Sequence, residues 1–140
     1  MPAGEGSVPG ARRQARERAL SLLYEAELTG RPPSEVLAGL PVEPARFAAE
    51  LVEGVGRHQP ELDAYLRRFA RDWSLERMPT VDRALLRIGT FELLHRPDVP
   101  TAAVISEAVE LAQAYSTAES ARFVNGMLAR IAEEVRAEPA

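Results

Sequence analysis

Apolar side chains recur every three or four residues along most of the chain, and proline or glycine separates the repeats. This spacing places the apolar side chains on one face of an α-helix, and no alternating strand pattern occurs. We expect helices over residues 11–28 and 34–40, one around 47–55, a separate one starting at Pro60 and a short helical turn in 72–79. Three more are expected: one over 81–95, one capped by Thr101 and a last one through 124–135. The pattern therefore predicts an all-α fold of about seven helices.

Residues 81–95 differ from the other segments because apolar side chains cover most of the helix circumference. A helix that is apolar nearly all round is usually buried on every side. We expect this helix to be the centre of the core. In the last helix we expect Gly126, which is costly inside a helix, to mark a close contact with another helix.

Length and composition fit one globular domain with a soluble, cytoplasmic character. The 140 residues are 46% hydrophobic and 27% charged, without cysteine. No apolar run reaches the roughly 18 residues of a membrane span, and the N-terminus lacks the features of a secretory signal. Residues 1–10, rich in glycine and proline, are expected to form a disordered leader before a single domain over 11–140.

Catalytic chemistry finds little support in the sequence. His58 and His95 are the only histidines and lie far apart in the chain. Glycine-rich phosphate loops, zinc-protease spacing and nucleophile elbows are all missing from the sequence. We therefore expect neither an enzyme nor a metal or cofactor site.

Positive charge is concentrated at the start of the first helix, although the chain carries a net charge of −4. Arg12 and Arg16 share a helix face with Arg13 beside them, and Glu17 lies one turn after Arg13. Arg12 and Arg16 are left without a matching acid one turn on. Two interpretations stay open: a solubilising basic helix end, or a patch that contacts phosphates.

An aromatic side chain in the last helix offers a second candidate for nucleic-acid binding. Phe123 lies about 100° from Val124, the first residue of the apolar stripe, and next to Arg122. It is therefore either an edge residue of the core or an exposed ring beside a guanidinium group. The second arrangement stacks an unpaired base.

Four segments together resemble the NusB family of bacterial transcription antitermination factors: "ARRQARERALSLLYEAEL", "VDRALLRIGTFELL", "DVPTAAVISEAVELAQAYS" and "SARFVNGMLARI". The resemblance covers about residues 11–136. It implies two packed helical subdomains that bind boxA, a single-stranded leader RNA, together with NusE, a small-subunit ribosomal protein. The complex assists RNA polymerase on ribosomal RNA operons without catalysis or cofactor. Both monomers and homodimers occur in the family.

The resemblance also implies roles for individual residues. Asp82 matches an acidic position that contacts NusE. Gln14 stands where the family often has a further basic residue, which removes one expected phosphate contact. Positions that match the RNA-binding residues of the family are Arg12, Arg13, Arg16, Tyr24, Glu119, Arg122, Phe123 and Asn125.

Two other interpretations stay open at this point. The chain could be the RNA-binding domain of an RNA cytosine methyltransferase, some of which carry a NusB-like domain, if the sequence is a fragment. It could also be a helical scaffold that binds only proteins. The feature that separates these readings is whether Arg16 and Phe123 meet on one exposed surface.

Overall fold

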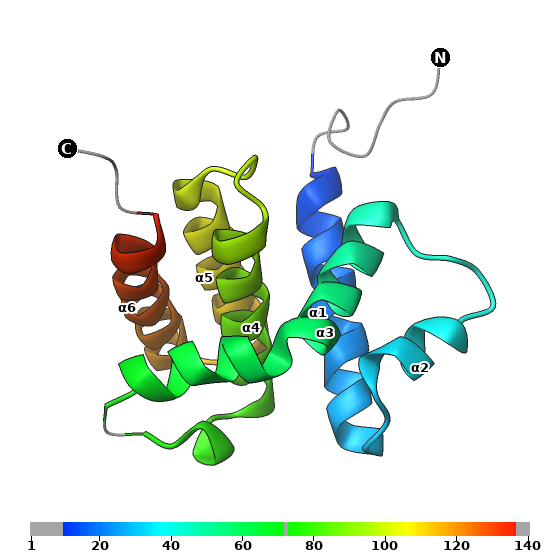
Figure 1. Cartoon of the computed structure of the whole chain (residues 1–140), viewed down its shortest axis with the longest axis horizontal. Helices are drawn as coiled ribbons and strands as arrows, with labels where there is room; N and C mark the ends of the chain where they lie inside the picture. The colour runs from blue at the N-terminus through cyan, green and yellow to red at the C-terminus, as the bar shows by residue number, and fades with distance from the viewer. Residues whose placement is uncertain (1–9, 72, 137–140) are drawn as a thin grey trace.

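The computed structural model describes residues 10–71 and 73–136, and throughout these ranges the only regular elements are helices (Figure 1). This confirms the predicted all-α class with about seven helices. None of the described helices is long and apolar enough to cross a membrane. The elements are α1 (Ala11–Thr29), α2 (Pro33–Ala38), α3 (Arg46–Phe69), the 3-10 helix η2 (Leu75–Arg77), α4 (Thr80–His95), α5 (Thr101–Tyr115) and α6 (Ala118–Val135).

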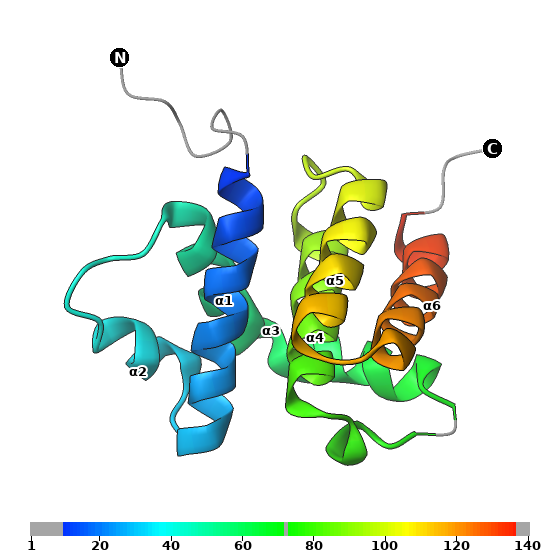
Figure 2. The ribbon, with the colours of Figure 1, turned by 180° about the vertical axis from the view of Figure 1, so that it is seen from behind.

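The helices form two packed groups that share α3. Helices α1 and α2 lie on one side with the first part of α3, while α4, α5 and α6 lie on the other (Figures 1 and 2). The last part of α3 crosses beneath α4 and α6 in Figure 1. This arrangement agrees with the two packed helical subdomains that the family resemblance implies.

Helix α3 runs through Pro60, so the expectation of a separate helix starting there is wrong. A proline inside a helix removes one backbone hydrogen bond and bends the axis. Figure 1 shows α3 changing direction partway along its length. The helix persists because its apolar stripe stays in phase across the proline: Val55, Leu62 and Leu66 are all buried.

Helix α4 is the centre of the core, as its apolar circumference predicts. It contacts α1, α3, α5 and α6. A Cβ atom added to Gly89 would lie 2.7 Å from Leu128 on α6, and one added to Gly54 on α3 would lie 2.2 Å from Phe91 on α4. These two glycines therefore permit the close helix contacts.

Gly126 does not have the role expected from the sequence. A Cβ atom there would approach only the flexible end of Arg130, at 3.2 Å. The expectation of a close helix contact at Gly126 is therefore wrong, because this part of α6 faces the surface.

Candidate nucleic-acid interface

Arg16 is buried, so the prediction that it contacts RNA phosphate is wrong for this structure. Its side chain is 5% exposed, and that of Glu92 on α4 is 1% exposed. The guanidinium donates through Nε and Nη2 to the two Glu92 carboxylate oxygens, at 3.0 and 2.7 Å. A buried charge requires such a partner. Glu92 lies 76 residues from Arg16 in the sequence. Helical spacing indicates only partners about one turn away, so it could not predict this pair.

Arg12 and Arg13 lie at the surface but also have acidic partners. Arg12 lies 3.5 Å from Asp98 and 4.7 Å above the centre of the Phe47 ring. Arg13 donates to Glu110 at 2.5 Å. Arg12 has no acid one helical turn on, as the sequence indicates, and its acidic partner comes instead from the connection after α4.

The acids around this arginine cluster are electrostatically coupled to it. Hydrogen bonds from Arg96 lower the pKa of Asp98 to about 2. Burial raises the pKa of Glu107, which lies 3.7 Å from Arg13, and a hydrogen bond with Glu110 raises it further.

Arg18 differs from the other arginines at the start of α1, because it is exposed and pairs with no acid among the described residues.

Phe123 lies at the edge of the core with part of its ring open to solvent. Trp73, in the connection after α3, packs edge-on against it with ring centroids 5.0 Å apart and an angle of 64°. Both open alternatives from the sequence are therefore partly met: the ring packs against the core and still reaches the surface. A hollow of about 410 Å³ lies beside it, lined by Phe69, Ala70, Arg71, Trp73, Phe123 and Arg130. We call this the Phe123 hollow.

Positive charge at the Phe123 hollow has no acidic partner within the described part of the chain. Arg130, which lines the hollow, and Arg122, which precedes Phe123 in the sequence, are exposed and form no ion pair there. Glu119, one turn before Phe123, and Asn125 are exposed on the same helix. Helical spacing places Glu119 on the same side of α6 as Phe123, whereas Asn125 lies about 200° around the helix from Phe123.

Three residues of the hollow were missed from the sequence. Arg130 follows Phe123 by two helical turns, so helical spacing could have placed it on the same side of α6. Arg71 and Trp73 lie beyond the end of α3, and only the tertiary packing brings them to α6. The sequence offers no periodic signal for that contact.

Arg16 and Phe123 do not meet on one exposed surface, because Arg16 is buried and the two candidate regions lie apart. Helix α5 lies between α1 and α6 in Figure 2. The cluster of Arg12 and Arg13 borders α5 on one side, through Glu110, and Phe123 belongs to α6 on the other. An RNA that touches both would have to span the helices between α1 and α6.

Asp82 is fully buried, so the prediction that its carboxylate contacts NusE is wrong. It lies in the first turn of α4, where the helix dipole favours an acid. Ser116 donates from its hydroxyl to Asp82 Oδ1 at 3.0 Å. The neighbouring residue Thr117 caps α6, because its side-chain hydroxyl accepts a hydrogen bond from the Ser120 backbone N–H.

A groove with two exposed tyrosines lies beside this end of α4. It has a volume of about 390 Å³ and is lined by Glu17, Leu20, Ser21, Tyr24, Val81 and Tyr115. The Tyr115 hydroxyl donates to Glu17 at 2.5 Å, and this hydrogen bond raises the pKa of Tyr115. Tyr24 and Tyr115 remain 39% and 52% exposed, so aromatic surface is available to a partner. We call this the tyrosine groove.

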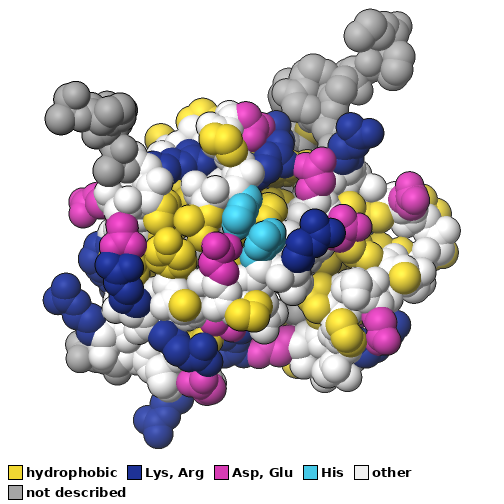
Figure 3. All heavy atoms as spheres, viewed as in Figure 1, with side chains coloured by type: hydrophobic (Ala, Val, Ile, Leu, Met, Phe, Trp, Pro, Cys, Tyr) yellow, Lys and Arg dark blue, Asp and Glu magenta, His cyan; other side chains and the backbone are white. Residues whose placement is uncertain are grey.

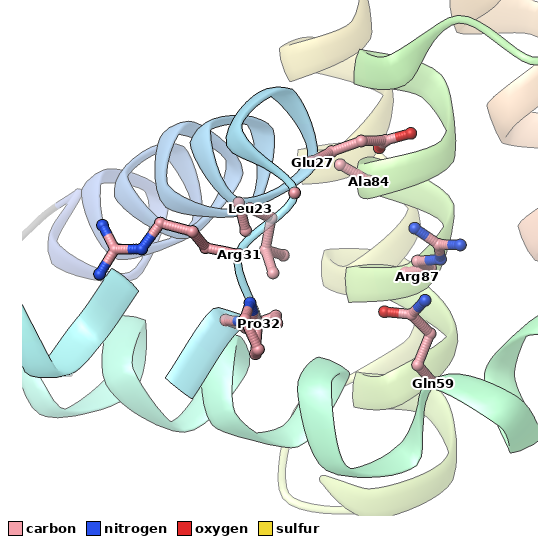
Figure 4. Close-up of a pocket in the computed structure, with 10 residues that line it drawn as sticks. Leu23, Glu27, Arg31, Pro32, Gln59, Ala84 and Arg87 are labelled. Atoms are coloured by element: carbon pink, nitrogen blue, oxygen red, sulfur yellow. The ribbon is translucent and has the colours of Figure 1, made fainter. Parts of the chain in front are cut away.

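A third hollow, of about 380 Å³, lies where α1, α3 and α4 meet (Figure 4). Its charged side chains already have partners. Arg87 binds both carboxylate oxygens of Asp63, and Glu27 pairs with Arg83. Figure 4 shows Arg31 directed away from Gln59 and Arg87. These groups hold the helices together and do not converge on the hollow.

Comparisons with known proteins agree with the resemblance. A profile of the NusB family matches residues 13–133. A transcription antitermination protein NusB from Kineococcus radiotolerans is 53% identical over 127 residues, which are 88% of this chain and 93% of that protein. A solved structure of T. maritima NusB has a TM-score of 0.79 at 32% identity, covering 88% of this chain and 91% of that one. A solved structure of antitermination factors NusB and NusE with double-stranded RNA has a TM-score of 0.75 at 29% identity, covering 87% and 96%. The chain therefore belongs to the NusB family.

Proposed function

We propose that the chain is a transcription antitermination factor that binds single-stranded boxA-like RNA of ribosomal RNA leaders together with NusE. Its part in this complex, which would include RNA polymerase, is binding and not catalysis. The Phe123 hollow is the observation that carries the proposal. It combines an accessible aromatic edge with cationic side chains that no acid neutralises.

The chemistry of the Phe123 hollow suits an unpaired nucleobase. Single-stranded RNA is recognised by stacking bases on aromatic rings or guanidinium planes. Phe123 and Trp73 offer the rings, while Arg122 and Arg130 offer charge for the adjacent phosphates. Asn125 would supply an amide for a base edge, and Glu119 would accept a hydrogen bond from a base amino group.

Arg12 and Arg13 would make weaker contacts at the far edge of the same RNA. Each must exchange an acidic partner for a phosphate, whereas Arg122 gives up only water. The net gain from an exchanged ion pair is small. We therefore expect the contacts on α6 to contribute more to RNA affinity than the contacts on α1.

The tyrosine groove is the proposed NusE surface. Exposed tyrosines are enriched at protein interfaces because they combine apolar area with a polar tip. Tyr24, assigned to RNA by the resemblance, lies in this groove together with Val81, the neighbour of the buried Asp82. A related NusB chain has been solved with NusE and RNA, which supports a shared mode of assembly.

A binding titration tests the proposal. A boxA-like single-stranded RNA and a scrambled RNA of equal length are titrated with the chain, with and without NusE. We expect preference for the boxA-like RNA, tighter binding with NusE, and loss of that enhancement in Tyr24→Ala. Binding of NusE without any RNA binding above background would instead identify a protein-only scaffold.

A further inference from the structure

The fold brings together the only two histidines of the chain, which the sequence separates by 37 positions. His58 lies within α3 and His95 is the last residue of α4. Their rings stack with centroids 4.1 Å apart. Figure 3 shows both imidazoles side by side at the surface, with an acidic side chain next to them. The two histidines, far apart in the sequence, are therefore neighbours in the fold.

Glu61 completes a group of three metal-ligand side chains. Its Oε1 atom lies 2.8 Å from His95 Nε2 and 3.6 Å from His58 Nδ1. One donor atom from each of the three residues lies within 4.8 Å of the others. Two imidazole nitrogens and one carboxylate oxygen match the donor set of zinc sites that keep a fourth position open for water.

The fold fixes the backbone of this group but leaves its side chains adjustable. His58 and Glu61 stand one turn apart on α3 on either side of Pro60, and Phe91 packs beneath both imidazoles with ring centroids 5.9 and 5.3 Å away. The three side chains are 33%, 47% and 32% exposed in chain order. Ligand bonds of about 2.0–2.2 Å require donors roughly 3–4 Å apart, so rotation of the exposed side chains is sufficient.

We propose that His58, Glu61 and His95 bind one divalent transition-metal ion of the zinc class. Nitrogen-rich donor sets select zinc, copper or nickel over magnesium and calcium. The ion would join the bent region of α3, which both helical groups share, to the end of α4. It would therefore stabilise the relative position of the two groups. This inference is independent of the proposed RNA-binding function.

The test uses the full untagged chain, whose two histidines give two imidazole signal sets in an NMR spectrum. Zinc chloride is titrated by calorimetry and NMR, with magnesium chloride in parallel. We expect one zinc ion per chain, movement of both imidazole signals, a higher melting temperature with zinc, and no response to magnesium.

Substitutions of the three proposed ligands distinguish a specific metal site from nonspecific zinc binding. His58→Asn, His95→Asn and Glu61→Gln should each weaken zinc binding at least tenfold. Glu53→Gln, an exposed acid of the same helix, is the matched control and should leave the affinity unchanged. Glu61→Gln keeps the size and polarity of the side chain, so it remains informative if a histidine variant folds poorly. Movement of only one imidazole signal, or equal zinc affinity in Glu61→Gln and the wild type, would overturn the proposal.

Discussion

The start of α1 and the Phe123 hollow of α6 both contain arginine, but the two regions use it differently. Arg16 is buried against Glu92, and Arg12 and Arg13 pair with Asp98 and Glu110 at the surface. On α6, Arg130 in the Phe123 hollow and Arg122 next to Phe123 face solvent with no acid paired to them in the described structure. Density of positive charge in a sequence is therefore a poor measure of the charge available to a ligand.

The difference follows from where each helix packs. Helix α1 lies against α4 and against the acidic side of α5, so its arginines hold helices together. The Phe123 side of α6 borders the end of α3 and the connection after it, where the aromatic pair of Phe123 and Trp73 lies beside a hollow. One region therefore stabilises the fold, and the other is left for binding.

The largest expected effect is on stability, at the Arg16–Glu92 pair. Arg16→Ala should lower the free energy of unfolding by roughly 3–5 kcal/mol, because it leaves a buried carboxylate without its partner. Urea denaturation measures this loss, and RNA affinity measured under conditions where the variant is folded should be unchanged. The double variant Arg16→Met with Glu92→Leu should recover much of the stability. Weaker RNA binding by a fully folded Arg16→Ala protein would contradict this account, because it would show that Arg16 contributes to RNA binding.

The next effect is on RNA affinity, at Phe123. Phe123→Ala should weaken binding of single-stranded RNA by about 1–3 kcal/mol, the value of one base stacked on an aromatic ring. Fluorescence anisotropy with a labelled boxA-like RNA measures it. Leu28→Ala, which removes an exposed apolar side chain of α1, is the control and should bind normally. Unchanged affinity in Phe123→Ala would show that the ring only packs against Trp73.

Two glycine substitutions compare the core contact of α4 with the open face of α6. Gly89→Ala places a methyl group 2.7 Å from Leu128, and such overpacking typically costs about 1–3 kcal/mol. Gly126→Ala meets only the end of Arg130 and should gain up to about 1 kcal/mol from helix propensity. In thermal denaturation, Gly89→Ala should therefore melt below the wild type and Gly126→Ala above it. A destabilised Gly126→Ala would mean that this face of α6 is tightly packed after all.

The smallest effect concerns Asp98, which holds Arg96 and Arg12. Hydrogen bonds from Arg96 lower its pKa to about 2 in the folded protein, below the usual value of 3.8. A lowered pKa means that the ionised group stabilises the fold above about pH 4, and that this contribution disappears as the pH falls towards 2. For an exposed pair it should be under about 1 kcal/mol. Asp98→Asn should therefore melt slightly below the wild type at pH 5 and together with it near pH 2; a constant difference across this range would contradict the assignment.

The sequence was sufficient for the fold class and for the central place of α4, because both follow from the spacing of apolar residues. Local rules failed where tertiary contacts outweigh them. Pro60 marks a helix start by local rules, yet the buried stripe on both sides of it keeps α3 continuous.

The candidate site shows the same limit. Phe123 and Arg122 could be found because they are neighbours on one helix. Glu92 as the partner of Arg16, Trp73 as the partner of Phe123 and the burial of Asp82 all depend on contacts between distant segments. The stacked histidines could not be predicted for the same reason.

The central claim is that the RNA contacts around Phe123 on α6 are stronger than those at the start of α1. It is tested most directly by the salt dependence of RNA binding in Arg122→Ala and in Arg18→Ala, which remove the same charge from an exposed, unpaired arginine. Loss of one phosphate contact to single-stranded RNA lowers the salt slope by about 0.7. We expect this decrease in Arg122→Ala and an unchanged slope in Arg18→Ala. A decrease in Arg18→Ala with no change in Arg122→Ala would contradict the account.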